Sequence, residues 1–473
     1  MLREQRRFFL WAGLAGLTVR LFFLVYFSTA TDDSRVYLDL AGNWLTHGVY
    51  GLTESGRIVP ADTRLPGYPG FLAAIFLVFG AGNVRAVLAA QILFDLGSCL
   101  LIADLARRMI ARRWAGRTAF LLAALCPFLA NYAAAVLTET LEIFFTTLAL
   151  DCGVAALDRT RASQPDLAEH SGAGPGWLWA ATGAAIAACI LLRPDGGILL
   201  AAVAVYVAWA TIEGHRPVRR LMAAELTIIF FALAPLVPWA YRNWTTLHQF
   251  QPLAPRYATE AEEVTPRGFN RWVRTWMADY VSVEEIYWNV PGDKIDADKL
   301  PQRALDSARE GTLGVIADYN SAQRLTAQVD MRFGEVAAER IRAHPIRYYF
   351  GLPLLRMGDV WLRPRCELLP ADPRWWEFND DPRWSAVSVA FGALNLLFVG
   401  TAAAGLIFRR GDIRYAGLLV CFVALRSAFL GTIESPETRY TLECYPAIIV
   451  LGSAWISGRI GRREPEELGA RAG

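Results

Sequence analysis

About ten apolar segments run through the sequence, and each approaches or exceeds the length that a helix needs to cross the roughly 30 Å hydrocarbon core of a bilayer. A single soluble core cannot bury so many long apolar segments, and hydrophobic residues make up 54% of the 473 residues. We therefore expect an all-α polytopic membrane protein with about ten transmembrane helices. The segments lie approximately at 8–27, 84–106, 117–132, 136–157, 177–192, 196–212, 221–241, 386–408, 414–431 and 440–458.

Arginine residues predict the orientation of these helices, because cytoplasmic connections carry an excess of Arg and Lys. The first apolar run follows three arginines and has no small-residue cleavage site, so we expect a retained helix with a cytoplasmic N-terminus. Two long loops, 28–83 and 242–385, then fall on the noncytoplasmic side of the inner or plasma membrane. The basic connections placed inside are 107–117, Arg159 with Arg161, 216–220, 409–414 and 459–463.

The chain divides into three predicted segments: an N-terminal transmembrane module (1–241), a large outer lobe (242–385) and C-terminal transmembrane helices with a cytoplasmic tail (386–473). In the first outer loop, the run 67–80 is too short to span a bilayer and predicts a re-entrant or interfacial helix. Upstream of it, apolar residues at helical spacing predict a helix on the membrane surface.

The second outer loop predicts a mainly helical lobe that rests on the outer leaflet. It has helix-like stretches at 301–344 and 346–362, separated by Pro345. Nine of the sixteen tryptophans lie between Trp239 and Trp384, and we interpret them mainly as an interfacial belt.

Charge and metal-ligand patterns exclude several classes of function. The formal net charge of +2 does not indicate a nucleic-acid partner. The five histidines are scattered without ligand spacing, so we expect no metal and no required cofactor. A divalent metal bound by acidic residues of the second loop is the alternative, although such residues are more typical of a solvated surface.

Charged side chains converge on the outer face of the predicted topology. Asp32, Asp33 and Arg35 follow the first helix, Arg64 precedes the re-entrant helix, and Glu139 lies near the outer end of the fourth helix. A guanidinium matches a phosphate bidentately. A neutralised phosphate leaves readily, so transfer of a sugar from it to a hydroxyl needs a carboxylate base but no strong general acid. Asp32 or Asp33 fits that base.

Three strings carry a resemblance to a known family: Asp32-Asp33-Ser34-Arg35-Val36-Tyr37, then Arg64-Leu65-Pro66-Gly67-Tyr68-Pro69, then Thr138-Glu139-Thr140-Leu141. In order, spacing and sidedness they resemble the C-type, lipid-phosphate-dependent glycosyltransferases, and look closest to the bacterial branch related to protein O-mannosyltransferases and the lipid A aminoarabinose transferase. The resemblance covers roughly residues 10–240. The chain departs from the family in having Asp-Asp where Asp-Glu is commoner and in having fewer helices.

The resemblance implies an inverting glycosyltransferase that moves a monosaccharide from a polyprenyl-phosphate donor to a free hydroxyl of a protein, lipid or glycan on the noncytoplasmic side. It places the acidic pair, Asp32 and Asp33, and the second acidic position, Glu139, in catalysis. Arg193-Pro194-Asp195 and Arg439-Tyr440 resemble outer-end motifs of the family. The predicted substrate-binding residues are Arg35, Tyr37, Arg64, Tyr68, Arg193, Arg439 and Tyr440.

Structural roles compete with these assignments. Asp32, Asp33 and Ser34 are typical caps of a helix, and interfacial arginines such as Arg35 and Arg64 also contact lipid headgroups. Glu139 and Glu142 share a helical face that would also serve packing. Arg20 and Asp95 lie at similar depth and are better interpreted as a buried ion pair than as catalytic residues. Residues 434–439 also fit a polar turn.

Two other functions compete with catalysis. A transporter or flippase of a lipid-linked sugar needs similar phosphate-binding arginines, but it typically binds near the midplane between structural repeats. We find no repeat, and the charged groups gather at one face, which favours an enzyme. A membrane scaffold gives no reason for the acidic pair and arginines to precede a re-entrant helix.

Overall fold

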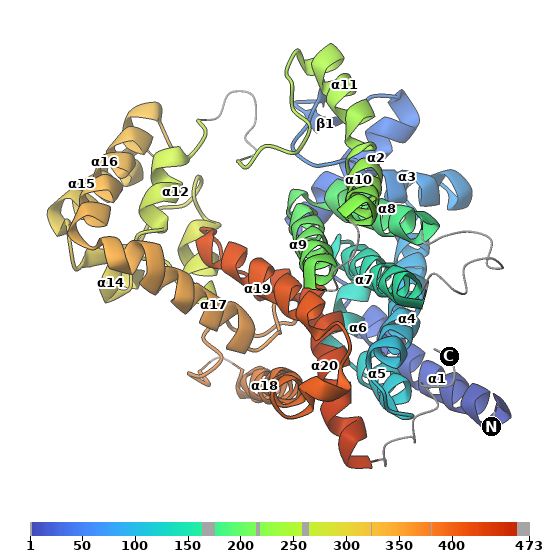
Figure 1. Cartoon of the computed structure of the whole chain (residues 1–473). Coiled ribbons are helices and arrows are strands. Elements are labelled where there is room, and N and C mark those ends of the chain that lie inside the picture. Colours follow the sequence, from blue (N-terminus) through green and yellow to red (C-terminus); the bar gives the residue numbers. More distant parts are fainter. Residues whose placement is uncertain are drawn as a thin grey trace. The chain divides into compact units, whose positions relative to one another are not determined.

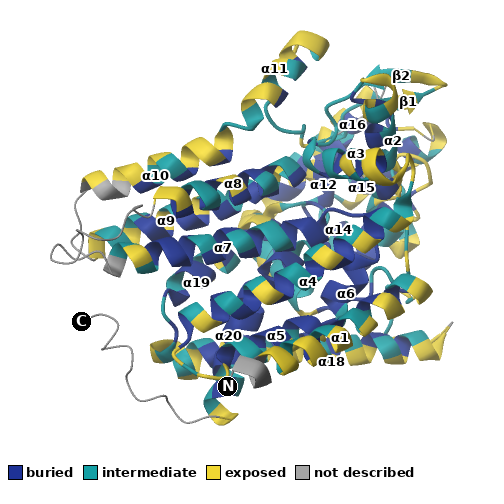
Figure 2. Ribbon diagram, turned by 90° about the vertical axis from the view of Figure 1, so that its right-hand side faces the viewer, coloured by how far each residue is buried: buried dark blue, intermediate teal, exposed yellow. Residues whose placement is uncertain are grey.

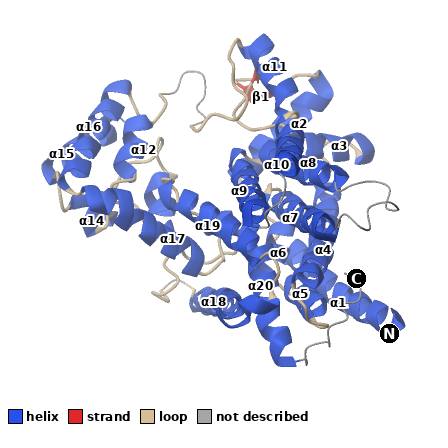
Figure 3. Ribbon diagram, in the orientation of Figure 1, coloured by secondary structure: helices blue, strands red, loops and turns tan. Residues whose placement is uncertain are grey.

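The computed structural model describes residues 2–162, 176–213, 218–257, 264–322, 324–379 and 381–460. Parts of the basic connections 216–220 and 459–463 lie outside these residues. The described chain is mainly helical, with one antiparallel hairpin made of β1 (Gly51–Glu54) and β2 (Arg57–Pro60) (Figure 3). The prediction of an all-α polytopic membrane protein is confirmed.

Six helical stretches in the described residues are long and apolar enough to cross a membrane. They comprise α1 (Leu2–Tyr26), α4 (Val84–Met109), α7 (Glu139–Ala162), η2 with α9 (Pro194–Gly196, Gly197–Glu213), α10 with α11 (Val218–Leu233, Leu236–Leu247) and α18 (Pro382–Arg409) with η6 (Arg410–Asp412). Shorter apolar helices are α3 (Gly67–Phe79), α5 (Ala115–Ala124), α8 (Gly176–Leu192) and α19 (Ala416–Thr432). The total of about ten spans stays a prediction.

The chain forms two compact units. Unit 1 comprises 1–255, 397–423 and 442–473, and unit 2 comprises 256–396 and 424–441. Both the large outer loop and the C-terminal helices are divided between these units. The three predicted segments, which follow the chain order alone, therefore stay a prediction.

Helix α7 lies at the centre of unit 1. It packs against α4 and α8 (Figure 2). Of the residues in its most apolar stretch 78% are buried, compared with 22% in the apolar stretch of 222–247. The short helix α6 (Pro127–Ala133) and the C-terminal helix α20 (Tyr445–Ile460) belong to the same unit. Because neighbouring helices surround α7, the carboxylates of its first turn, Glu139 and Glu142, are enclosed by protein.

The first outer loop folds into the two helices that its sequence pattern predicts. Helix α2 (Asp32–His47) packs beside α3 and the hairpin (Figure 1). Its N-terminus has a capping box formed by Thr31 and Ser34, so Asp32 and Asp33 lie in the first turn without being the cap. The hairpin turn has positive φ at Ser55 and Gly56, as a two-residue type I′ turn requires.

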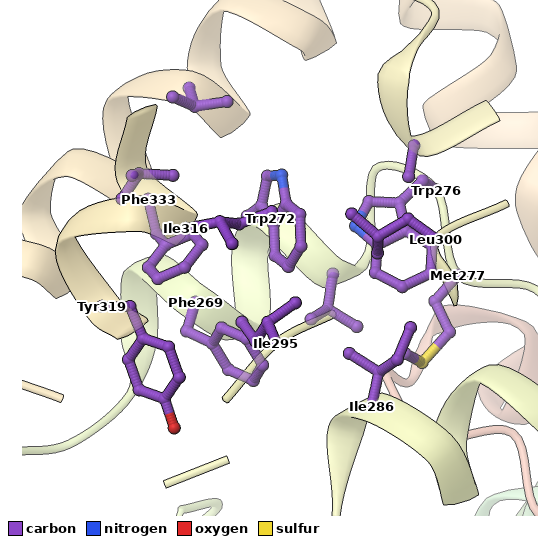
Figure 4. Packing of buried hydrophobic residues seen from close by; sticks show 14 of the residues in the cluster. Phe269, Trp272, Trp276, Met277, Ile286, Ile295, Leu300, Ile316, Tyr319 and Phe333 are labelled. Atoms are coloured by element: carbon purple, nitrogen blue, oxygen red, sulfur yellow. The ribbon is translucent and has the colours of Figure 1, made fainter. Parts of the chain in front are cut away.

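Unit 2 is a helical lobe with an aromatic core. Trp272, Trp276, Phe269 and Phe333 pack together in it and are almost completely buried (Figure 4). These two tryptophans thus stabilise the lobe and are not part of the predicted interfacial belt. The elements of this unit are α12 (Arg267–Val273), α13 (Tyr280–Ser282), η3 (Val283–Tyr287), η4 (Ala297–Lys299), α14 (Gln302–Leu305), α15 (Arg309–Ala322), α16 (Ala327–Ala343), η5 (Arg347–Gly351) and α17 (Leu352–Leu362), with part of α18, part of α19 and the start of η7 (Thr438–Cys444).

Candidate active site

Two backbone contacts bring distant parts of unit 1 to one place. The segment before α2 pairs with the segment before α7 through a parallel bridge between Thr29 and Ala135. The start of α3 lies directly on the end of α8, where a Cβ at Gly67 would meet the carbonyl oxygen of Leu191 at 2.6 Å. Only glycine permits that approach. The loop that carries Arg64 is therefore held close to the end of α8, where Arg193 follows.

The two adjacent carboxylates of α2 have different surroundings. Asp33 accepts a hydrogen bond from Nη2 of Arg64 at 2.8 Å, and both side chains are about one-third exposed, at 30% and 31%. Asp32 accepts from Nη1 of Arg35 at 3.1 Å, but these side chains are 96% and 80% exposed. The sequence predicts both aspartates as catalytic residues, and the structure shields only Asp33 together with an arginine from another segment.

Arg64 is held by its backbone as well as by its side chain. The Tyr50 hydroxyl is within hydrogen-bond distance of the carbonyl oxygens of Arg64 and Leu65, at 2.9 and 3.2 Å. Burial lowers the pKa of Arg64, but Tyr37 and Asp33 outweigh this effect and raise the pKa overall, so the guanidinium stays charged. Sequence reasoning missed Tyr50, because no spacing rule connects it to Arg64.

Four charged groups interact with Tyr37. The Arg64 guanidinium is 5.8 Å from the centre of its ring, and Arg193 and Glu139 also interact with it electrostatically. Burial raises the pKa of Tyr37 to about 12, so the phenol keeps its proton at neutral pH. The structure thus gathers Asp33, Arg64, Arg193 and Glu139 around one tyrosine.

Tyr68 forms the wall behind Tyr37. The two rings meet edge to face with centroids 4.9 Å apart, and Tyr68 is fully buried. Its hydroxyl donates to Oε1 of Gln91 at 2.6 Å, and Nε2 of Gln91 donates to the carbonyl oxygen of Ala135 at 2.7 Å. Tyr68 therefore supports the ring of Tyr37, while its predicted contact with substrate stays a prediction.

Arg193 is surrounded by three carboxylates. Its guanidinium nitrogens lie 3.6 Å from Glu139, 3.5 Å from Glu142 and 3.4 Å from Asp195. Arg193 is extended, as the residue before a proline tends to be, and this conformation ends α8 and starts the short turn η2. Glu443 also interacts electrostatically with Glu142.

Of this carboxylate group, only Glu139 is predicted from the sequence as a site residue. Glu142 lies three residues later on the same helical face, and that spacing was the available signal. Glu443 lies about 300 residues after Glu142 in the chain, so helix periodicity carries no signal for it.

Arg439 and Tyr440 belong to unit 2 and lie in the first turn of η7, which begins at Thr438. Nε of Arg439 lies 2.7 Å from Oε2 of Glu437, and the Tyr440 hydroxyl donates to Oε1 of the same carboxylate at 2.5 Å. Nearby, Glu434 accepts from Arg256 at 3.0 Å and from Tyr257 at 2.5 Å. These contacts order the segment that sequence reasoning treats as a polar turn or a binding motif, and a substrate role for Arg439 and Tyr440 stays a prediction.

The predicted buried ion pair of Arg20 and Asp95 is confirmed. Nε of Arg20 donates to Oδ2 of Asp95 at 2.6 Å, and both side chains are buried. Arg20 also donates to the carbonyl oxygens of Gly16, Ala123 and Ala124, so its donors are engaged in holding α1 against α4 and α5. Among the described residues, no cluster of three His, Cys, Asp or Glu side chains is arranged to hold a metal ion.

Comparison with known proteins gives matches only to solved structures, since no family model and no curated protein matches the chain. The archaeal oligosaccharyltransferase AglB from Archaeoglobus fulgidus, in complex with an inhibitory peptide and a dolichol-phosphate, matches with a TM-score of 0.50 and 12% identity, over 98% of this chain and 53% of AglB. The Archaeoglobus fulgidus oligosaccharyltransferase tethered with an acceptor peptide matches with 0.50 and 12%, over 94% and 49%. ArnT from Cupriavidus metallidurans, bound to undecaprenyl phosphate, matches with 0.40 and 15%, over 95% and 78%.

These matches concern the fold. The chain spans about half the length of the oligosaccharyltransferase structures, at 49% and 53%. The two oligosaccharyltransferase matches, each with a TM-score of 0.50 at 12% identity, show that the chain shares their fold, and this is the kind of fold that the sequence resemblance predicts.

Proposed function

We propose that the chain is an inverting glycosyltransferase that transfers a monosaccharide from a polyprenyl-phosphate donor to a hydroxyl acceptor on the noncytoplasmic side of the membrane. The observation that carries this proposal is the pairing of Asp33 with Arg64 beside Tyr37, with Arg193 and Glu139 acting on the same tyrosine. One carboxylate and two guanidiniums at one place are the groups that this reaction needs. The bound dolichol-phosphate of the AglB structure is in keeping with a lipid-phosphate donor.

In the proposed reaction, Arg64 and Arg193 bind the donor phosphate and neutralise its charge. The acceptor hydroxyl attacks the anomeric carbon from the face opposite the phosphate, and the bond between that carbon and the phosphate oxygen breaks. The lipid phosphate leaves with the electron pair of that bond, and the configuration inverts. Asp33 accepts the proton of the attacking hydroxyl, so no free alkoxide has to form.

The surroundings of the two aspartates favour Asp33 over Asp32 as the proposed base. A base needs a fixed position within hydrogen-bond reach of the hydroxyl, and Asp33 is fixed by Arg64 whereas the pair Asp32 and Arg35 is open to water. Glu139 is proposed to hold Arg193 in place, because its carboxylate is buried beside that guanidinium. Arg439 and Tyr440 are kept as candidate contacts to substrate.

Partners of the proposed reaction are the donor lipid, the bilayer and an acceptor protein, lipid or glycan with a free hydroxyl. The six apolar stretches support the membrane location. No step requires a metal ion, because arginines supply the charge that neutralises the phosphate.

The decisive experiment uses purified protein in lipid nanodiscs with a labelled polyprenyl-phosphate sugar and a panel of hydroxyl acceptors. A transferase releases lipid phosphate only when an acceptor is present, and it does so with the native chain but not with Asp33→Asn. Asp32→Asn serves as the matched carboxylate control. Movement of the labelled lipid across a liposome membrane without release of lipid phosphate would instead establish the transporter.

A further inference from the structure

The helical segment formed by η5 and α17, together with Ile346 directly before η5, has an exposed apolar stripe. Ile346, Phe350, Leu354 and Leu362 follow one another at multiples of four residues, and they are 77%, 67%, 64% and 53% exposed. Gly358 occupies the one missing position of this series. Tyr349 and Leu355 widen the stripe and are also exposed. A stripe of this kind marks an amphipathic helix whose apolar face meets something other than water.

The opposite face of the segment is fixed within unit 2. Arg356, which is buried, donates to the carbonyl oxygens of Arg274 at 2.7 Å, Met277 at 2.9 Å and Gly431 at 3.1 Å. The first two carbonyls belong to the chain that follows α12, and the third lies at the end of α19. Arg356 thus joins the segment to both the lobe and an apolar helix, and leaves its other face uncovered in unit 2.

Further contacts place the C-terminal end of α17 against two apolar helices. Nε1 of Trp361 donates to Oγ of Ser427 in α19 at 2.9 Å, and Nδ2 of Asn395 in α18 donates to the carbonyl oxygen of Trp361 at 2.7 Å. The parts of α18 and α19 that belong to unit 2 also expose apolar side chains. These are Val389, Leu396, Leu425 and Phe429. The stripe on α17 therefore continues an exposed apolar surface of two helices with apolar composition.

The segment is too short to cross the bilayer itself. The five residues of η5 and the eleven of α17 give a length of about 24 Å, which is below the thickness of the hydrocarbon core. It also contains Arg347, which pairs with Asp306 of the lobe, and Arg356. A helix of this kind lies along the interface, with its apolar face among the acyl chains and its polar face toward protein and water.

We propose that η5 and α17 form a membrane anchor of unit 2, with the stripe Ile346, Phe350, Leu354 and Leu362 inserted into the acyl chains of the bilayer. Lipid is the occupant that the contacts favour, because the stripe is continuous with the exposed apolar sides of α18 and α19. The anchor fixes the depth at which unit 2 meets the membrane. This inference is independent of the reaction proposed above.

The test places an environment-sensitive fluorophore on single introduced cysteines in the full chain, reconstituted in phosphatidylcholine liposomes. Phe350→Cys and Leu354→Cys report the stripe, and Glu339→Cys on an exposed position of α16 is the matched control. The seven native cysteines are buried or half-buried, and the native chain labelled in parallel gives their background. Tyr349→Cys replaces Phe350→Cys if that variant fails to insert.

The anchor predicts blue-shifted emission at positions 350 and 354, with at least about twofold stronger quenching by lipids that carry a doxyl group near the headgroup than by lipids that carry it at the chain end. Position 339 should emit as in water and resist both lipids. Emission as in water at all three positions would overturn the proposal. Blue-shifted emission without quenching by either lipid would overturn the proposal and assign the stripe to a protein contact. Stronger quenching from the chain end would also overturn it, because the helix would then be deeply inserted instead of lying along the interface.

Discussion

Arg64 donates a hydrogen bond from Nη2 to Oδ1 of Asp33 at 2.8 Å, and this contact joins the loop before α3 to the first turn of α2. In the proposed reaction the same carboxylate is the base and the same guanidinium binds the phosphate. A guanidinium that turns to a phosphate withdraws from its carboxylate, which then regains lone pairs for a proton. We therefore expect Asp33 to become available to the acceptor only after the donor has bound.

Asp33→Asn should lower kcat by about a hundredfold or more and leave the donor Kd within a few fold, because the amide keeps the volume but cannot accept the proton. Asp32→Asn should change kcat by no more than a few fold, since Asp32 is 96% exposed. Initial rates and donor binding, measured on correctly inserted protein, separate the two effects. Equal losses of kcat in both variants would contradict the proposal that Asp33 is the base. Near-normal rates in both variants would contradict the proposed mechanism as a whole.

Arg64→Ala should weaken donor binding and also lower kcat, because negative charge grows on the phosphate as the sugar leaves. Arg64→Lys should recover only part of the loss, since an ammonium cannot make the bidentate contact. Donor binding and single-turnover rates provide the measurement, with Arg35→Ala as the exposed arginine control. If Arg35→Ala had the larger effect on donor binding, the phosphate would lie at the N-terminal, solvent-exposed side of α2.

Tyr50→Phe should raise the donor KM by a few fold and change kcat less. The variant removes the hydroxyl that lies 2.9 Å from the Arg64 carbonyl but keeps the ring, which packs against Trp44 and Trp239. One lost hydrogen bond of this kind is worth about 1 kcal/mol, which corresponds to roughly a fivefold change in an equilibrium. Tyr26→Phe, at an exposed tyrosine, is the control. A drop in thermal stability without a change in the donor KM would make Tyr50 merely structural.

The elements around the site follow from local patterns in the sequence. The surface helix α2 and the short helix α3 are predicted because apolar residues recur at helical spacing and because 67–80 cannot span a bilayer. The same pattern cannot distinguish Asp32 from Asp33, since both lie in the first helical turn. The distinction arises from Arg64, which is 31 residues away in the chain.

Other features depend on tertiary packing that a single sequence does not encode in its periodicity. Tyr50 acts through a hydroxyl directed at a backbone carbonyl. Every tyrosine in the loop carries such a hydroxyl, so the residue type alone does not identify Tyr50. Trp272 and Trp276 have the residue type of an interfacial belt, yet they fill the core of the lobe because α16 covers them. Composition cannot separate these two environments.

Asp95→Ala should destabilise the protein by about 3–5 kcal/mol, because it leaves the buried guanidinium of Arg20 without its carboxylate. The double variant Arg20→Leu with Asp95→Leu should lose less, since it removes both charges together. Arg35→Ala is the control, because it removes only an exposed ion pair. Asp412→Ala would be unsuitable, because Asp412 forms an ion pair with Arg112 that is largely shielded from water. Thermal unfolding in detergent measures the differences. A double variant less stable than Asp95→Ala would show that the carbonyl contacts of Arg20 dominate over its charge.

The proposed orientation places the first outer loop outside and the connection between α4 and α5 inside. Ser28 and Ala111 are both exposed and represent these two sides, whereas Thr438 is fully buried and would be a poor reporter. Ser28→Cys should react with a membrane-impermeant thiol reagent in intact cells, and Ala111→Cys should react only after the membrane has been opened. Because the native cysteines are buried or half-buried, labelling of the unmodified chain gives the baseline. The reverse pattern would invert the topology and place Asp33 and Arg64 on the cytoplasmic side. The proposed reaction would then require an acceptor in the cytoplasm.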